Sequence, residues 1–171
     1  MKYQQILCII AGLLPLAVII ILSAASVNFV LFADFISDLG VGDYALIFNA
    51  TLVVASLLAV PFAFHVYKRY NYLIVLFLAT ILSLIGVGLF PSTSGLHMPL
   101  AALFFLLAFA TILAAGTKMT RRRSKWTSFA LGVLGFYGLA VFSPLTETLL
   151  VFAIGFWVAG VGLFSKRLYE K

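Results

Sequence analysis

The stretch ILCIIAGLLPLAVIIILSAASVNFVL, residues 6–31, contains no charged side chain. About 20 apolar residues in an α-helix are enough to cross the hydrocarbon core of a bilayer. The run is longer than the apolar core of a secretory signal peptide, which has about 7–15 residues. We therefore expect a membrane-spanning helix over residues 6–31, and not a signal peptide that is removed.

Five further apolar blocks follow, separated by short polar breaks. They predict helices over residues 44–65, 72–90, 98–118, 126–142 and 146–164. The chain of 171 residues is 64% hydrophobic and 9% charged, whereas a soluble domain is about 25% charged. Short connections make consecutive helices antiparallel neighbours. The sequence therefore predicts an all-α, polytopic membrane protein in which residues 1–171 form one domain, an antiparallel bundle of six transmembrane helices.

The basic residues all fall on one side of such a bundle. The eleven Lys and Arg residues lie in four segments, namely Lys2; Lys68 and Arg69; Lys118, Arg121, Arg122, Arg123 and Lys125; and Lys166, Arg167 and Lys171. Short loops rich in Lys and Arg stay on the cytoplasmic side. We therefore expect a multi-pass protein of the cell membrane, with both termini cytoplasmic and with membrane lipids as partners. The same topology explains the net charge of +6, so nucleic acid is not an expected partner.

Aromatic residues flank the basic side of the predicted bundle. Tyr70, Tyr72 and Trp126 lie next to the basic segments. Trp and Tyr are enriched where a membrane meets water. We interpret these three residues, together with Tyr67 and His65, as interfacial residues.

The opposite side of the predicted bundle collects most of the acidic residues. It receives four of the five, Asp34, Asp38, Asp43 and Glu147, and no Lys or Arg. Asp43 directly precedes the helix at 44–65 and is expected to be its N-cap. Glu147 is expected in the first turn of the last helix, where the helix dipole favours an anion. Asp34 is expected at the rim of this face.

Asp34 and Asp38 are four residues apart and are expected to share a face near the C-terminal end of the first helix. Like charges at this spacing repel each other, and the helix dipole disfavours anions at that end. The pair therefore calls for a compensating partner, which is a cation, a proton, or a hydrogen-bond donor from His97 or Asn49. A solvated acidic loop without such a partner is the alternative interpretation.

Asn49 and His97 each have two interpretations. Asn49 lies inside the helix at 44–65, where an amide must find hydrogen bonds within the bundle. It is either a contact between helices or the floor of an outward-facing pocket under Asp38 and His97. His97 itself is either an interfacial residue or a ligand-binding residue.

Small residues and the single cysteine have structural explanations. GVLGFYG, residues 132–138, and GFWVA, residues 155–159, allow close packing of helices. Cys8 is expected to be a small apolar helix residue, and Ser143-Pro144 is expected to start the last helix.

The sequence indicates no cofactor, and no Cys/His cluster has the spacing of a zinc site. Asp38 and His97 are weak candidates for a metal site, which would suit a hard divalent cation.

Four motifs carry a resemblance to a known family. They are ISDLG (36–40), LIFNA (46–50), IGVGLFP (85–91) and GLHMPLA (95–101). In this order they resemble the prokaryotic membrane family catalogued as domain of unknown function 998, most clearly over residues 30–115. The matching positions are Ser37, Asp38, Gly40, Asn49, Gly86, Phe90, Pro91 and His97. The resemblance implies six spans, a membrane location and mostly archaeal members, and supplies no reaction. The order of motifs is also similar to that of the eukaryotic DRAM/Frag family, from which we carry over no function.

These features predict an outward-facing polar pocket that binds a lipid head group or a small polar ligand. Asp38, His97 and Asn49 form it, and Asp34, Ser37 and Glu147 contribute. If the protein is an enzyme, His97 is the candidate general base for hydrolysis or transfer on a lipid head group, and Asp38 orients it or holds a metal.

The alternative function is a non-catalytic accessory subunit of a larger membrane complex. The sequence also leaves open whether the protein forms a homo-oligomer. Ion-coupled transport is disfavoured, because no charged residue lies near the middle of a predicted span.

Overall fold

Six α-helices and one short 3₁₀-helix make up the computed structural model, which describes residues 2–67 and 70–169, without the side chains of residues 65–67 and 166–169. The elements are, in chain order, α1 (Tyr3–Ala25), η1 (Ile36–Gly40), α2 (Ala45–Tyr67), α3 (Asn71–Leu89), α4 (His97–Lys118), α5 (Arg122–Ala140) and α6 (Pro144–Tyr169). The predicted all-α fold is confirmed, and each predicted helix is present. The interfacial positions predicted for His65 and Tyr67 concern side chains that lie outside the described residues.

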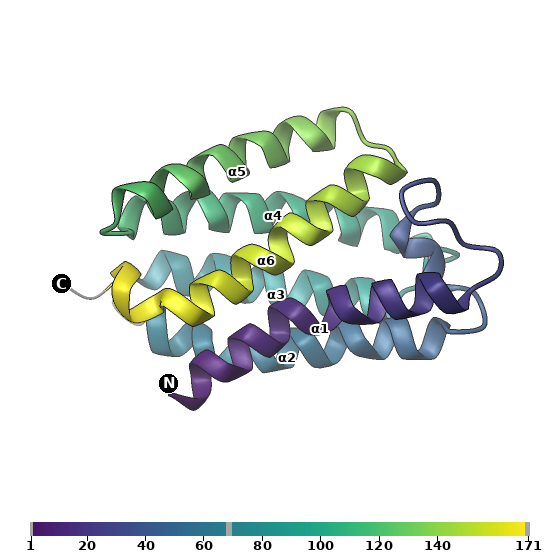
Figure 1. The fold of residues 1–171 in the computed structure, drawn as a ribbon, viewed down its shortest axis with the longest axis horizontal. Helices are drawn as coiled ribbons and strands as arrows, with labels where there is room; N and C mark the ends of the chain where they lie inside the picture. The colour runs from purple at the N-terminus through teal and green to yellow at the C-terminus, as the bar shows by residue number, and fades with distance from the viewer. Residues whose placement is uncertain (1, 68–69, 170–171) are drawn as a thin grey trace.

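The helices lie side by side and alternate in direction (Figure 1). Each helix packs on the next one along the chain, and α6 returns to pack along α1, so the helices form a ring. α5 packs mainly on α4 and much less on α6. As a result, α1 begins and α6 ends at the same end of the bundle, and the long connection between α1 and α2 lies at the other end.

The first helix is shorter than predicted. α1 ends at Ala25, and not near residue 31, because Ser26 adopts an extended backbone and its N–H closes the last turn on the Leu22 carbonyl. The 23 residues of α1 already measure about 34 Å, enough for a hydrocarbon core of about 30 Å. Asp34 therefore lies in the connection and Asp38 in η1, so the predicted repulsion along one helix face is wrong.

Five of the described helices are long and apolar enough to cross a membrane. They cover Tyr3–Ala25, Ala45–Phe64, Asn71–Leu89, His97–Lys118 and Pro144–Ser165. α5 is not among them, because its first turn carries Arg122, Arg123 and Lys125. Length and composition thus support five of the six predicted spans.

The burial pattern of α5 is the reverse of that in a soluble protein. Its buried residues are all small, namely Ser128, Gly132, Gly135 and Gly138. Most of its large side chains, including Val133, Leu134 and Tyr137, are exposed. In water the large apolar side chains of a helix are the ones that become buried. Small residues between helices and large apolar residues outside are typical of a helix that faces lipid.

Close contacts at the predicted glycine patterns are confirmed. A Cβ on Gly135 would lie 2.2 Å from the ring of Phe109 in α4. α1 and α6 meet backbone to backbone, because a Cβ on Gly12 would lie 2.5 Å from the carbonyl oxygen of Gly155. Cys8, one turn before Gly12, is buried as predicted. The missing side chains at these glycines set the distance between the helices.

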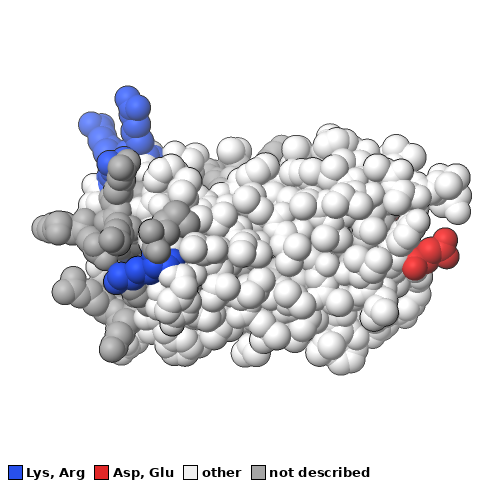
Figure 2. Space-filling model, turned by 60° about the horizontal axis from the view of Figure 1, so that its bottom comes forward, with Lys and Arg blue, Asp and Glu red and all other residues white. Residues whose placement is uncertain are grey.

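The described charged residues separate to the two ends of the bundle (Figure 2). The basic end is where α1 and α5 begin and α4 ends, and it holds Lys2, Lys118, Arg121, Arg122, Arg123 and Lys125. The acidic end holds the connection between α1 and α2. The Lys118 ammonium lies 5.2 Å and 5.6 Å from the ring centres of Tyr70 and Tyr72, so aromatic residues do flank the basic end. In Figure 2 the surface between the ends is free of charged side chains.

One of the two predicted helix starts at the acidic end is confirmed. α6 begins at Pro144, and Ser143 Oγ accepts a hydrogen bond from the Thr146 N–H at 3.3 Å. α2 begins at Ala45, so Asp43 is two residues before the first helical residue and is not the N-cap. The reason is local, because the Gly42 carbonyl already accepts the Ala45 N–H at 3.0 Å.

Candidate functional site

A cavity of about 140 Å³ runs along the inside of the bundle. η1 and all described helices except α5 contribute to its wall. It is lined from Glu147 to Val158 on α6, and from Phe48 to Ala59 on α2. The two residues named on each helix are eleven positions apart, which corresponds to about 16 Å of α-helix. The cavity is therefore long, narrow and parallel to the helices, and we call it the central cavity.

The wall of the central cavity is mainly apolar, with polar residues gathered at the acidic end of the bundle. Ser37 of η1, His97 at the start of α4 and Glu147 in the first turn of α6 all line it. We call these three residues the polar end. Ser56 and Thr80 lie further along, and their hydroxyls donate to carbonyls of their own helices at 2.7 Å and 2.8 Å. The hydrogen-bonding capacity of the cavity is thus concentrated at one end.

His97 is 3% exposed, and one hydrogen bond orients its ring. Nδ1 lies 2.7 Å from the carbonyl oxygen of Phe90, directly after α3. A carbonyl oxygen only accepts, so Nδ1 donates, and in the neutral ring Nε2 is an acceptor. The hydrogen bonds of the described residues leave both His97 Nε2 and Ser37 Oγ without a partner. Both atoms keep their capacity to bind a ligand.

Glu147 ties η1 to α6 over the end of the central cavity. It is 6% exposed, and its Oε2 accepts a hydrogen bond from the Ile36 N–H at 2.5 Å. Ile36 is the first residue of η1. A buried carboxylate needs such donors to replace the water that it has lost. The predicted place of Glu147 in the first turn of α6 is confirmed, and its contact with η1 is a second role.

Asn49 ties the other end of η1 to α2. Its Nδ2 donates to the carbonyl of Gly40, the last residue of η1, at 3.0 Å. A Cβ on Gly40 would lie 2.8 Å from Asn49 Oδ1, so glycine allows this close approach. Of the two interpretations of Asn49, the structural contact is the one that the hydrogen bond supports.

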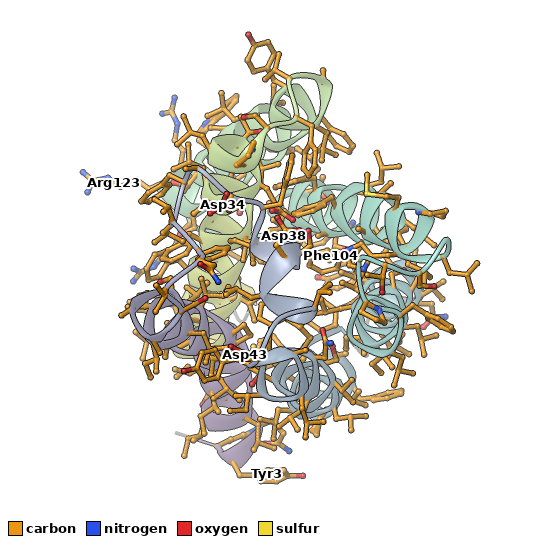
Figure 3. The ribbon with its side chains drawn as sticks, turned by 90° about the vertical axis from the view of Figure 1, so that its right-hand side faces the viewer. Tyr3, Asp34, Asp38, Asp43, Phe104 and Arg123 are labelled. Carbon is orange, nitrogen blue, oxygen red and sulfur yellow. The ribbon has the colours of Figure 1, made fainter. Side chains whose placement is uncertain are left out.

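The three aspartates before α2 line a second cavity of about 250 Å³, at the outer surface of the acidic end. Figure 3 looks at the bundle from this end, with Asp38 near the middle, Asp34 above and to the left of it, and Asp43 below it. Asp34 Oδ2 accepts a hydrogen bond from the Val30 N–H at 2.7 Å. Asp38 is exposed. We call this space the outer cavity.

The structure divides the predicted site residues between the two cavities. Ser37, His97 and Glu147 line the central cavity, Asp34 and Asp38 line the outer cavity, and Asn49 lines neither. Ser37 and Asp38 separate although they are adjacent, because successive residues of a 3₁₀-helix lie about 120° apart. No three His, Cys, Asp or Glu side chains of the described residues lie close enough together to hold a metal ion.

A family model matches most of the chain. The model described as "Protein of unknown function (DUF998)" matches residues 9–164. The chain belongs to this family. No curated protein and no solved structure matches the chain. The family membership indicated by the sequence motifs is thus confirmed, and the matched range of this DUF998 protein includes every residue that lines the two cavities.

The hydrogen bonds of the structure make Asp34, and not Asp43, the more important of these two aspartates of the outer cavity for stability. Asp34→Ala should cost about 1 kcal/mol, because it removes the acceptor of the Val30 N–H. Asp43→Ala should change stability by less than about 0.5 kcal/mol, as is usual for exposed residues. Thermal unfolding of both variants in the same detergent checks this order. A larger loss for Asp43→Ala would show that Asp43 caps α2 after all.

Proposed function

We propose that α5 also crosses the membrane, which gives six spans, with both termini in the cytoplasm of a cell. α5 runs antiparallel to α4 with its large apolar side chains outward. Its apolar part within the helix, residues 126–140, has 15 residues, and Val141 and Phe142 directly after α5 extend the apolar stretch to 17, the lower end of the spanning range. Arg122, Arg123 and Lys125 then lie at the cytoplasmic surface, where the positive-inside rule places them. This orientation directs the polar end of the central cavity outward.

We infer that the polar end binds the head group of a lipid or another small polar ligand from the outer side of the membrane. The observation that carries this function is the meeting of Ser37, His97 and Glu147, from three separate elements, at one end of the central cavity. Ser37 Oγ and His97 Nε2 are available there. The apolar wall behind them excludes water, which strengthens any hydrogen bond that a head group makes.

The variant His97→Asn separates binding from folding. The amide nitrogen of Asn takes the place of Nδ1 and preserves the hydrogen bond to the Phe90 carbonyl, whereas Nε2 is lost. We expect thermal stability close to wild type and about tenfold less bound ligand, the effect of one hydrogen bond of about 1.4 kcal/mol. The measurement is mass spectrometry of the molecules that stay on the purified protein in mild detergent.

His97→Leu is the matched control, because it loses both ring nitrogens and should lower stability as well as binding. Wild-type protein that carries no lipid or other small molecule would contradict the proposal. Equal amounts on wild type and His97→Asn would do the same. A protein partner that co-purifies in place of a small molecule would instead favour an accessory subunit of a membrane complex.

A further inference from the structure

We propose that the central cavity takes one hydrocarbon chain of an amphiphile whose head group is uncharged or cationic. The inference rests on the proposed function and specifies its ligand class. The head group lies at the polar end, beside Ser37, His97 and Glu147, and the chain extends between the helices toward Val158. Three properties of the cavity lead to this ligand, namely its shape, its wall and the charge at its end.

The shape of the central cavity fits one chain. About 140 Å³ corresponds to roughly ten water positions. The cavity is about 16 Å long, the length of eleven residues of α-helix. With this volume, it is about as wide as one hydrocarbon chain. It is too small for the two chains of a phospholipid together.

The wall of the central cavity favours a chain over water. The side chains between the polar end and Val158 include Leu52, Ile81, Phe104 and Ile154, which offer no hydrogen bond. Apolar cavities of this kind stay dry and bind apolar molecules. A chain also contacts this wall along its length, and these contacts add up to a large dispersion attraction.

The charge at the polar end selects the head group. The negative charges are those of Asp34, Asp38 and Asp43, which lie around the outer cavity next to the polar end. Glu147 is buried at the central cavity itself. All described Lys and Arg side chains are at the opposite end of the bundle. A site lined by charges of one sign repels ligands of the same sign and attracts the opposite sign. An amine or hydroxyl head group is therefore accepted at this end, and a phosphate or carboxylate head group is excluded.

Three probes with the same chain test the ligand class, namely dodecylamine, dodecanol and dodecyl phosphate. The purified full chain is placed in phosphatidylcholine nanodiscs, and its thermal midpoint is measured with each probe. Dodecylamine and dodecanol should raise the midpoint by about 5–10 °C at a concentration about 100 times Kd. Dodecyl phosphate should leave the midpoint unchanged.

Two neighbouring alanines of α4 test the position of the chain. Ala101 lines the central cavity, whereas Ala102 is exposed on the outside of the bundle. Ala101→Leu should fill the cavity and abolish the shift caused by dodecylamine. Ala102→Leu adds the same side chain and should keep the full shift. Ala55→Leu, which fills the cavity from α2, is the second blocking variant in case Ala101→Leu does not fold.

Each outcome decides one part of the inference. An equal midpoint shift with dodecyl phosphate would overturn the selection by charge. A shift that persists in folded Ala101→Leu or Ala55→Leu would overturn the chain position. The absence of any shift would overturn the ligand class as a whole. The proposed function has a separate criterion, because it depends on the molecules retained by wild type and by His97→Asn, whatever their chemical class.

Discussion

Gly12→Ala should destabilise the bundle by about 3 kcal/mol, the upper part of the usual range for an overpacked core. The added Cβ would lie 2.5 Å from the Gly155 carbonyl oxygen and 2.7 Å from the Ala159 backbone nitrogen. Both contacts are with backbone atoms, so no side chain can rotate away. α1 must move away from α6 along its length, and neighbouring side chains such as Leu16 lose contact with α6.

Gly160→Ala is the matched control for this prediction. Gly160 lies in α6, the helix that Gly12 contacts, but a Cβ on Gly160 would meet no atom within 4 Å. Alanine is also the better helix former, by up to about 1 kcal/mol, so Gly160→Ala should keep or raise the stability. Thermal unfolding in one detergent compares the two variants with wild type. Equal stability of Gly12→Ala and Gly160→Ala would show that α1 and α6 are not in backbone contact.

Glu147→Ala should cost about 2–3 kcal/mol, as expected when a buried charged hydrogen bond is removed. The Ile36 N–H loses its acceptor in a buried position, because Ile36 is only 3% exposed. η1 then keeps the hydrogen bond from Asn49 to Gly40 and the packing of its buried residues Ile36 and Leu39. We expect faster amide hydrogen exchange across η1 and a lower thermal midpoint, with little change in the exchange of α5.

Glu147→Gln tests whether the hydrogen bond or the charge matters. Its side-chain oxygen can still accept the Ile36 N–H as a neutral acceptor, so it should recover about half of the lost stability. Hydrogen exchange at η1 should be intermediate between wild type and Glu147→Ala. Unchanged exchange of η1 in Glu147→Ala would mean that this residue does not hold η1 in place.

The apolar blocks of the sequence predicted the helices well, because a span must satisfy its backbone within itself and needs a minimum length. The first helix was the exception. Its apolar run continues to Leu31, but the chain leaves the helix at Ala25, once the span is long enough. Hydrophobicity alone does not distinguish the end of a span from an apolar outer loop.

The candidate site was predictable in composition but not in arrangement. The sequence placed His97 and Glu147 on the same face, and they do line one cavity. Glu147 and Ile36 are 111 residues apart, so no local pattern indicates their hydrogen bond. The division between Ser37 and Asp38 depends on the 3₁₀ conformation of η1, which no pattern in the sequence indicated. The cavity wall has no sequence signal, because its apolar residues resemble those of any buried helix face.

We propose that the chain crosses the membrane six times and directs the polar end of the cavity outward. Single cysteines in a Cys8→Ser background test it, at Thr93 between α3 and α4, Ser124 at the start of α5 and Val141 after α5. A membrane-impermeant maleimide should label Thr93→Cys and Val141→Cys on intact cells, and Ser124→Cys only after permeabilisation. Labelling of Val141→Cys together with Ser124→Cys would show that α5 does not cross. Labelling of Ser124→Cys alone on intact cells would place the polar end in the cytoplasm and contradict the proposed orientation.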